Sequence, residues 1–225
     1  MAVTKLVIFD CDGTLVDSQH IILAAMREAF TNAGLTPLED ADVRSSVGLS
    51  PFEAVARLLP DESEEFHDKM AEDFRLAYYR QRTECSLGPD PLYAGTKDTL
   101  LALNDAGYML GVATGNSKRG LQRVIDDHGL EGLFVTLQTA DSHVSKPDPS
   151  MVYTAVTEAG SDVADSIMIG DTSYDMQMAK RAGCRALGVS WGYHSDTELT
   201  GAGAEHIARS FAEVPAVIER LIGKP

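Results

Sequence analysis

The sequence contains no apolar run that approaches the length of a membrane-spanning helix, which needs about 20 consecutive apolar residues. Residues 1–5 lead directly into the short apolar run 6–9, which has the length of a β-strand and not of a targeting segment. These absences argue against a membrane protein. We therefore expect a soluble, cytoplasmic protein that has no membrane partner.

Cysteine is scarce, and the three cysteines, Cys11, Cys85 and Cys184, show no paired spacing. Disulfide frameworks and zinc ribbons need cysteines in regular pairs, so the sequence argues against both. Cys11 is expected to pack in the protein interior, because free cysteines are among the most often buried residues.

Basic residues are also scarce. The sequence has 19 Lys and Arg residues but 34 Asp and Glu residues, which gives a net charge of −15. Proteins bind nucleic acids through Lys and Arg contacts to phosphates, so this balance argues against a nucleic-acid partner. A small anionic ligand would need local positive charge from a lysine or a metal ion. The sequence leaves open whether the protein is a monomer or a homodimer.

The sequence does contain a regular alternation of helical patterns and β-runs. Its 225 residues, 44% of them hydrophobic, are enough for one large α/β domain or for a domain with an inserted partner. From residue 96 onward, helical patterns alternate with β-runs at 108–113, 134–138, 167–169 and 186–190. This order predicts an α/β fold with a doubly wound parallel sheet.

Residues 14–92 contain no comparable β-run. Apolar residues recur every three or four positions over 21–30 and 66–78, which predicts helices. The tetrapeptide 50–53, Ser-Pro-Phe-Glu, has the form of a capping box with proline just inside the helix start. The segment therefore has the pattern of a separate helical module.

We predict a core domain of residues 1–15 and 92–225 and a small α-helical cap domain of residues 16–91, inserted after the first strand. The stretches 15–18 and 88–91 are the expected linkers. An insertion returns to the sheet edge that it left, so the module should lie over the crevice at that edge as a lid. A rigidly packed subdomain is the alternative.

Polar residues follow four of the predicted strands. In an open parallel sheet the carboxyl ends of the strands line one edge, so side chains at those ends converge on one crevice. Two carboxylates directly after a buried strand place charge where a fold normally avoids it, and a cation or a reaction can require them there. On that segment alone, a polar Asp-Gly turn remains the alternative. In chain order, the polar residues are Asp10 and Asp12, then Thr114, Gly115 and Asn116, then Lys146, and finally Asp171 and Asp175.

In this order, the motif Asp-x-Asp-Gly-Thr at 10–14, Thr114, Lys146 and the motif Gly-Asp-x-x-x-Asp at 170–175 resemble the haloacid dehalogenase superfamily. The resemblance covers essentially the whole chain and is to phosphatases with a small helical cap, the phosphoglycolate phosphatase-like and β-phosphoglucomutase-like subfamily. It implies a Rossmann-like core with an inserted cap. It also implies Mg²⁺-dependent hydrolysis of a small phosphomonoester through an aspartyl-phosphate.

The resemblance implies that Asp10 is the nucleophile and that Asp10, Asp171 and the backbone carbonyl of Asp12 hold Mg²⁺, an ion that prefers oxygen ligands. Asp175 would lie outside this set and orient the metal ligands or a lysine. Asp12 would protonate the leaving alcohol and then take a proton from the attacking water. Haloacid dehalogenases and phosphonoacetaldehyde hydrolases lack an acid at this position, so Asp12 argues against both reactions.

A second group of residues is implied to bind the phosphoryl group. Thr114 and the neighbouring backbone amides would donate hydrogen bonds to phosphoryl oxygens, and Asn116 would add a contact. Lys146 would bring a positive charge to the same oxygens while pairing with Asp10 or Asp171.

Substrate choice would lie mostly in the cap. Arg44 is our candidate for a cap residue that binds substrate, and the turn 47–50 could face the crevice. In the phosphoglucomutases of this group, the turn carries a lysine before the glycine and an arginine after the serine, where this chain has Val47 and Pro51. The mutases also tend to lack the threonine that stands here at Thr14. Both departures favour a hydrolase over a sugar-phosphate mutase, which is the first alternative.

Two further questions stay open. A non-catalytic binding module that keeps the fold is an alternative of a different class, although such a module is expected to lose a nucleophile, an acid or a metal ligand, and this chain has all of them. Trp191, Tyr193 and His194 follow the β-run 186–190 at the same sheet edge. They could touch the substrate or only close the loop.

Overall fold

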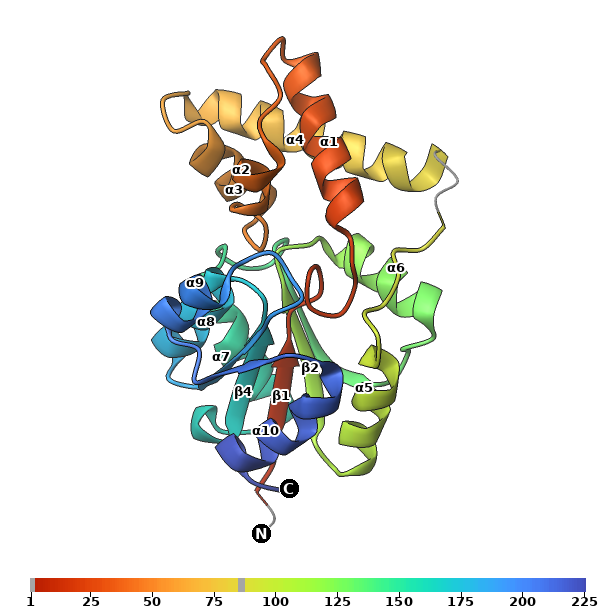
Figure 1. The fold of residues 1–225 in the computed structure, drawn as a ribbon, viewed down its shortest axis with the longest axis vertical. Coiled ribbons are helices and arrows are strands. Elements are labelled where there is room, and N and C mark those ends of the chain that lie inside the picture. Colours follow the sequence, from red (N-terminus) through yellow and green to blue (C-terminus); the bar gives the residue numbers. More distant parts are fainter. Residues whose placement is uncertain (1–2, 85–87) are drawn as a thin grey trace.

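The computed structural model describes residues 3–84 and 88–225, and these residues form a six-stranded parallel sheet with the strand order β3-β2-β1-β4-β5-β6 (Figure 1). The predicted α/β fold with a doubly wound parallel sheet is confirmed. Cys85 lies outside the described residues, whereas Cys11 and Cys184 are buried free thiols. The strands are β1 (Leu6–Phe9), β2 (Met109–Thr114), β3 (Phe134–Thr139), β4 (Ser166–Gly170), β5 (Arg185–Val189) and β6 (His206–Ala208).

Helices cover both faces of the sheet, because each strand places alternate apolar side chains on opposite faces. Val7 and Phe9 of β1 pack in one apolar cluster with α5, α6 and α10, whereas Leu6 and Ile8 pack in the opposite cluster with α7, α8 and α9. These helices are α5 (Thr96–Asp105), α6 (Lys118–His128), α7 (Ser150–Ala159), α8 (Ser173–Ala182), α9 (Asp196–Ala202) and α10 (Val214–Ile222), with two short 3-10 helices, η1 (Val163–Asp165) and η2 (Phe211–Glu213).

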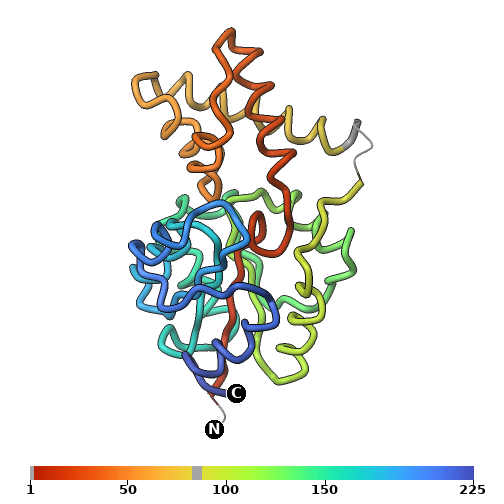
Figure 2. Tube along the Cα trace, viewed as in Figure 1, coloured from red at the N-terminus to blue at the C-terminus, as the bar shows by residue number. Residues whose placement is uncertain are grey.

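A separate helical module lies beyond the carboxyl ends of the strands, at the opposite end of the molecule from the C-terminus (Figure 2). In the described ranges it consists of α1 (Gln19–Asn32), α2 (Asp40–Arg44), α3 (Pro51–Leu58) and α4 (Glu64–Glu84). Its helices share an apolar cluster of their own, which includes Met26, Phe30, Val55 and Met70. Ser50 Oγ accepts a hydrogen bond from the Glu53 backbone N–H at 3.4 Å and so caps α3. None of the helices described in residues 3–84 and 88–225 combines the length and the apolar character needed to cross a membrane.

Two chain segments connect the module to the sheet, and they run side by side (Figure 2). Val16 and Leu92 form an antiparallel bridge, and the backbone N–H of Asp17 donates to the carbonyl oxygen of Pro91 at 2.9 Å. Val16 still packs in the apolar cluster of the sheet, whereas Gln19 begins the first helix of the module. The change from sheet packing to module packing therefore falls between these two residues.

Candidate active site

The chain turns back on itself directly after β1. The backbone N–H of Leu15 donates to the carbonyl oxygen of Cys11 at 2.8 Å and closes a tight loop. Gly13 has a φ of +86° in this loop, a left-handed conformation that glycine adopts readily. A Cβ at Gly13 would lie 2.3 Å from Asp171 Oδ2, so the loop passes too close to that carboxylate to carry a side chain. The loop thereby keeps both aspartates of the first motif at the carboxyl edge of the sheet.

Asp10 is buried at the end of β1, and only one of its carboxylate oxygens is held. Oδ1 accepts hydrogen bonds from Lys146 Nζ at 2.9 Å and from the Cys11 backbone N–H at 2.7 Å. Oδ2 is buried and finds no hydrogen-bond partner among the described residues. Because a buried oxygen without a partner is unfavourable, this atom is placed for a cation or a reacting group.

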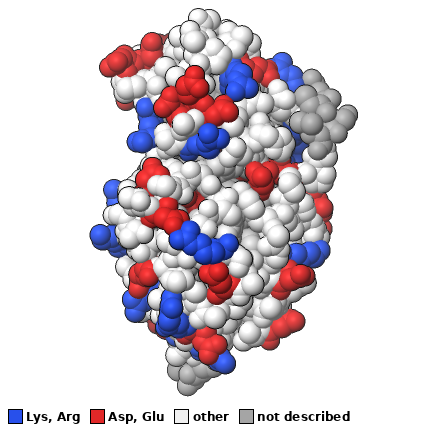
Figure 3. Space-filling view, in the orientation of Figure 1, with Lys and Arg blue, Asp and Glu red and all other residues white. Residues whose placement is uncertain are grey.

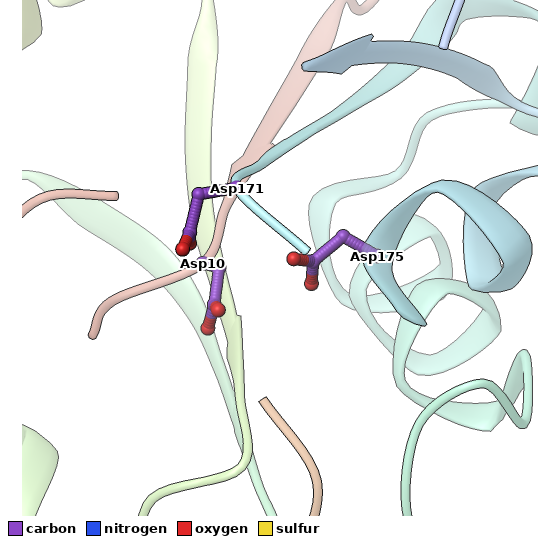
Figure 4. Close-up of side chains that lie close together, drawn as sticks. All are labelled: Asp10, Asp171 and Asp175. Carbon is purple, nitrogen blue, oxygen red and sulfur yellow. The ribbon is translucent and has the colours of Figure 1, made fainter. Parts of the chain in front are cut away.

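Asp171 follows β4, which pairs with β1, so the carboxylates of Asp171 and Asp10 lie side by side (Figure 4). Asp171 Oδ1 accepts from Thr14 Oγ1 at 2.7 Å, and its Oδ2 accepts from the Tyr193 backbone N–H at 2.9 Å. Figure 4 shows Asp175 reaching toward this pair from the start of α8. One carboxylate oxygen from each of these three aspartates lies within 4.8 Å of the other two.

Lys146 joins two of these carboxylates. Its Nζ lies 2.9 Å from Asp10 Oδ1 and 2.7 Å from Asp175 Oδ1. The other Asp175 oxygen accepts from the backbone N–H and the hydroxyl of Thr172, at 3.0 and 2.7 Å, within the capping box of α8. Of the two expected partners of Lys146, Asp10 pairs with it and Asp171 does not, because Asp171 is held from the other side and Asp175 lies closer.

The site concentrates negative charge. Burial raises the pKa of Asp10 to about 7, although the Lys146 ammonium opposes the shift. Burial, together with the carboxylates of Asp10 and Asp175, raises the pKa of Asp171 well above its usual value. Burial alone would lower the pKa of Lys146, but the same two carboxylates outweigh burial and raise it, so the lysine stays charged. Among the described residues, the three buried carboxylates are therefore accompanied by one buried lysine, which pairs with two of them.

This cluster fits a hard divalent cation. All of its side-chain donors are carboxylate oxygens, the type of ligand that Mg²⁺ and Ca²⁺ prefer. The Asp10 carboxylate could supply one ligand atom to such a cation, which would offset the excess negative charge. The carboxylate of Asp175 belongs to this cluster, although both its oxygens are already engaged by Lys146 and Thr172. The side chain of Asp12 is not part of it.

Asp12 is instead oriented by two polar side chains. Ser18 Oγ donates to Asp12 Oδ1 at 2.6 Å, and Asn116 Nδ2 donates to Asp12 Oδ2 at 3.0 Å. The Tyr193 hydroxyl lies 3.2 Å from Ser18 Oγ and extends the network. Asn116, which we expected to contact a phosphate, thus holds the second aspartate. With both oxygens held, the Asp12 carboxylate has a defined orientation.

Thr114 ends β2, the neighbour of β1 on the side opposite to β4. Its buried hydroxyl oxygen accepts from the Asn116 backbone N–H at 3.1 Å, so the O–H can still donate. Gly115 lies against the turn 47–50 of the helical module, where a Cβ would approach Leu49 O to 2.6 Å. The structure therefore brings this turn to the crevice.

A cavity of about 780 Å³ lies between the sheet edge and the helical module. Asp10, Asp12 and Thr114 line it from the sheet, and residues of α1, α3 and α4 line it from the module. The side chains at the ends of β1 and β2 thus face a space in which a ligand can bind.

Arg44, our candidate for substrate binding, does not line this cavity. Arg44 is half-buried at the end of α2, and the carbonyl oxygen of the next residue, Ser45, accepts from the Tyr174 hydroxyl at 2.8 Å. This contact holds the end of α2 against α8. Arg82 of α4 lines the cavity instead.

Sequence reasoning missed the partners that hold the site residues. Nothing in the sequence singles out Ser18 or Arg82. For the loop 191–194, its position directly after β5 indicated that it could lie near the site. The loop does close against the site. Trp191 Nε1 donates to the Thr14 carbonyl oxygen at 3.1 Å, and the Tyr193 backbone N–H donates to Asp171.

Comparisons with known proteins assign this chain to a family. The haloacid dehalogenase-like hydrolase family model matches residues 7–189, and the chain belongs to that family. The motif-based resemblance is thus confirmed. Over 219 residues the chain is 33% identical to a probable phosphatase IndB of Dickeya dadantii, covering 96% of this chain and 94% of that protein. Over 222 residues it is 29% identical to a phosphoglycolate phosphatase of Vibrio vulnificus, covering 95% and 96%. A crystal structure of a predicted phosphoglycolate phosphatase from Haemophilus somnus superposes with a TM-score of 0.80 at 25% identity, covering 96% of this chain and 99% of that one.

Proposed function

We propose that this protein is a Mg²⁺-dependent phosphatase that hydrolyses a small phosphomonoester through an aspartyl-phosphate. The observation that carries the proposal is the asymmetric environment of the Asp10 carboxylate. Lys146 and the Cys11 amide hold Oδ1, while Oδ2 is buried without a partner among the described residues, and Asp10 is one of the residues that line the cavity. A carboxylate held by one oxygen presents the other as a nucleophile.

A phosphate ester resists this attack because its oxygens repel an anionic nucleophile. Thr114, through its hydroxyl, and the backbone amide of Gly115 would donate to the phosphoryl oxygens, whereas the Asn116 amide already donates to the Thr114 hydroxyl oxygen. Lys146 adds a fixed positive charge beside the nucleophile. Asp175 is a positioning residue, because it holds the Lys146 ammonium from the far side.

We assign the metal to Asp10, Asp171 and the backbone carbonyl of Asp12. When bound there, Mg²⁺ neutralises charge on the phosphoryl group. The proposal is supported by the carboxylate cluster and by its single compensating lysine.

Asp12 serves as the general acid and then as the general base. As the bond from Asp10 Oδ2 to phosphorus forms and the ester P–O bond breaks, Asp12 gives its proton to the leaving alcohol. It then takes a proton from a water that attacks the aspartyl-phosphate, which releases phosphate and restores Asp10. Ser18 and Asn116 keep the Asp12 carboxylate aimed for both steps.

Residues 16–91 would act as the cap domain over a core domain of residues 1–15 and 92–225. The separate apolar cluster of the module and the cavity beneath it support this division. The substrate class is a small phosphorylated metabolite, and phosphoglycolate and sugar phosphates are the first to test because relatives carry such names. The buried free thiols suit the cytoplasm, where thiols stay reduced.

The test is phosphate release from phosphoglycolate, sugar phosphates, nucleotides and pyrophosphate, with Mg²⁺ or with EDTA. Turnover should require Mg²⁺ and should fall by about 10⁶ in Asp10→Asn, the loss typical of a missing nucleophile. Asp105→Asn, which changes an exposed carboxylate at the end of α5, is the matched control. Full activity of Asp10→Asn would overturn the assignment. Isomerised sugar phosphate without released phosphate would indicate a mutase, and Mg²⁺ binding without any turnover would indicate a binding module.

A further inference from the structure

The wall of the cavity that faces the sheet edge is apolar and aromatic. At about 780 Å³, the cavity lies within the roughly 300–1,000 Å³ of pockets that hold drug-sized ligands. A glycolate or a short polar chain attached to the phosphate would leave most of this wall uncovered. The large side chains that α3 and α4 place there are Phe52, Phe74, Leu76, Tyr78 and Tyr79.

The leaving group must occupy the side of the cavity that the apolar and aromatic wall forms. Asp12 serves the leaving oxygen, so the alcohol lies on the Asp12 side of the phosphate. Tyr78 lines the same cavity as Asp12. Tyr78 also stacks on Arg82, whose Cζ lies 5.0 Å from the ring centre.

Two of the wall side chains are open to solvent. Leu76 is 56% exposed and Tyr79 is 43% exposed, although both line the cavity. A ligand that covers the exposed part of this apolar area would bind more strongly.

Arginine side chains gather in the same cavity, although one of them, Arg82, is paired with Asp90. Arg75, Arg82, Arg119 and Arg123 line it, against Asp141 as the one acidic side chain besides Asp10 and Asp12 among the described lining residues. On the face drawn in Figure 3, by contrast, the two signs are interspersed. A guanidinium plane attracts a phosphate and also stacks on flat aromatic groups, as Arg119 does over the Tyr79 ring at 4.2 Å.

We propose that the substrate is a phosphomonoester whose leaving group is flat and aromatic, and that this group lies against the α4 wall at Leu76 and Tyr79. The proposal rests on the proposed phosphatase function and names its substrate class. It departs from the small polar leaving groups that the names of the relatives suggest, because those groups match neither the aromatic wall nor the cavity size.

The test is a matched series of ethyl, phenethyl and naphthylethyl phosphates. Their alcohols have similar acidity, so differences in rate report binding of the leaving group and not its chemistry. Burial of each added ring should raise kcat/KM by about tenfold. The gain should appear mainly in KM, since the wall binds substrate and transition state alike.

Two variants locate the effect. Leu76→Asp and Tyr79→Ala should each lower the ratio of kcat/KM for naphthylethyl over ethyl phosphate by about tenfold. Leu101→Asp on α5 and Tyr153→Ala on α7 change side chains that are also exposed but lie outside the cavity, and they should leave the ratio as it is. Circular dichroism and melting temperature check that all four variants fold.

The outcomes separate the two proposals. If ethyl phosphate and phosphoglycolate are hydrolysed and the aromatic esters are no better, the aromatic class is overturned while the phosphatase stands. If none of the esters releases phosphate with Mg²⁺ present, the phosphatase itself fails. If kcat/KM rises along the series but Leu76→Asp and Tyr79→Ala do not reduce this rise, the aromatic group does not bind at the α4 wall.

Discussion

The hydroxyl of Ser18 donates a 2.6 Å hydrogen bond to Asp12, although Ser18 occupies the N-cap position of α1. A serine at this position usually accepts from the first turn of its helix, but Ser18 makes no such bond. The side chain that begins the first helix of the module therefore holds the proposed general acid. The position of the module and the orientation of Asp12 are linked through one residue.

Ser18→Ala should lower kcat about tenfold and leave KM nearly unchanged, because general acid catalysis contributes roughly 10²–10⁴ and depends on geometry. Asn116 would still hold one oxygen of Asp12, so part of the activity remains. Steady-state kinetics with the best substrate measure the change. Ser210→Ala alters an exposed serine that does not line the cavity and is the control. An unchanged kcat in Ser18→Ala would show that Asp12 does not need this bond.

Mg²⁺ should stabilise the protein, because a ligand that binds only the folded state adds about 2.7 kcal/mol at 100 times its Kd. For a chain of this size that corresponds to a rise in melting temperature of about 5–10 °C. Asp171→Asn should abolish the rise, since Asp171 is one of the proposed metal ligands, whereas Asp105→Asn should keep it. Differential scanning calorimetry with Mg²⁺ or EDTA is the measurement. An equal rise in Asp171→Asn would place the metal elsewhere.

The metal-free protein should lose stability as pH rises from about 4 to about 7. Asp10 has a pKa of about 7 in the folded state against 3.8 as a reference, so between these values the folded state holds a proton that the unfolded state has released. This contribution is complete below pH 3.8 and is lost as pH passes the folded value. Urea unfolding in EDTA at several pH values, compared between wild type and Asp10→Asn, isolates it. If the free energy of unfolding varied with pH in the same way in both proteins, Asp10 would not be the group responsible for this loss of stability.

With Mg²⁺ present, stability should instead increase with pH, because metal binding needs deprotonated carboxylates and becomes stronger as pH rises. The same unfolding series with saturating Mg²⁺ is therefore the internal control. Asp10→Asn removes a ligand and should weaken this reversal.

Arg82 and Asp90 form a buried ion pair between the end of α4 and the segment that returns to the sheet. Their side chains are 7% and 1% exposed. Arg82→Met should lower the free energy of unfolding by about 3 kcal/mol, because it leaves a buried carboxylate uncompensated. The matched change Arg27→Met removes an exposed pair with Asp40, at 2.9 Å, and should change stability by less than about 1 kcal/mol. Urea unfolding compares the two variants, and equal effects would mean that burial does not decide the strength of this pair.

The convergence of the four polar clusters was predictable because the carboxyl ends of parallel strands share one edge. Strand order and side-chain alternation bring Asp10, Thr114 and Asp171 together without any knowledge of packing. The helical character of the α1 to α4 region was also predictable from the sequence, because amphipathic spacing is a local property. The strand β6 was not, because three residues are too few for a periodic signal.

What only the tertiary structure decided is how helices and loops present their side chains to that edge. Lys146 pairs with Asp175 and not with Asp171, because the start of α8 turns Asp175 toward it. Arg44 and Arg82 both lie on module helices, yet only Arg82 lines the cavity. The sequence by itself determined which chemical groups gather after the strands, because strand geometry is local. The partners of those groups depend on how the module packs onto the sheet, which is a property of the whole molecule.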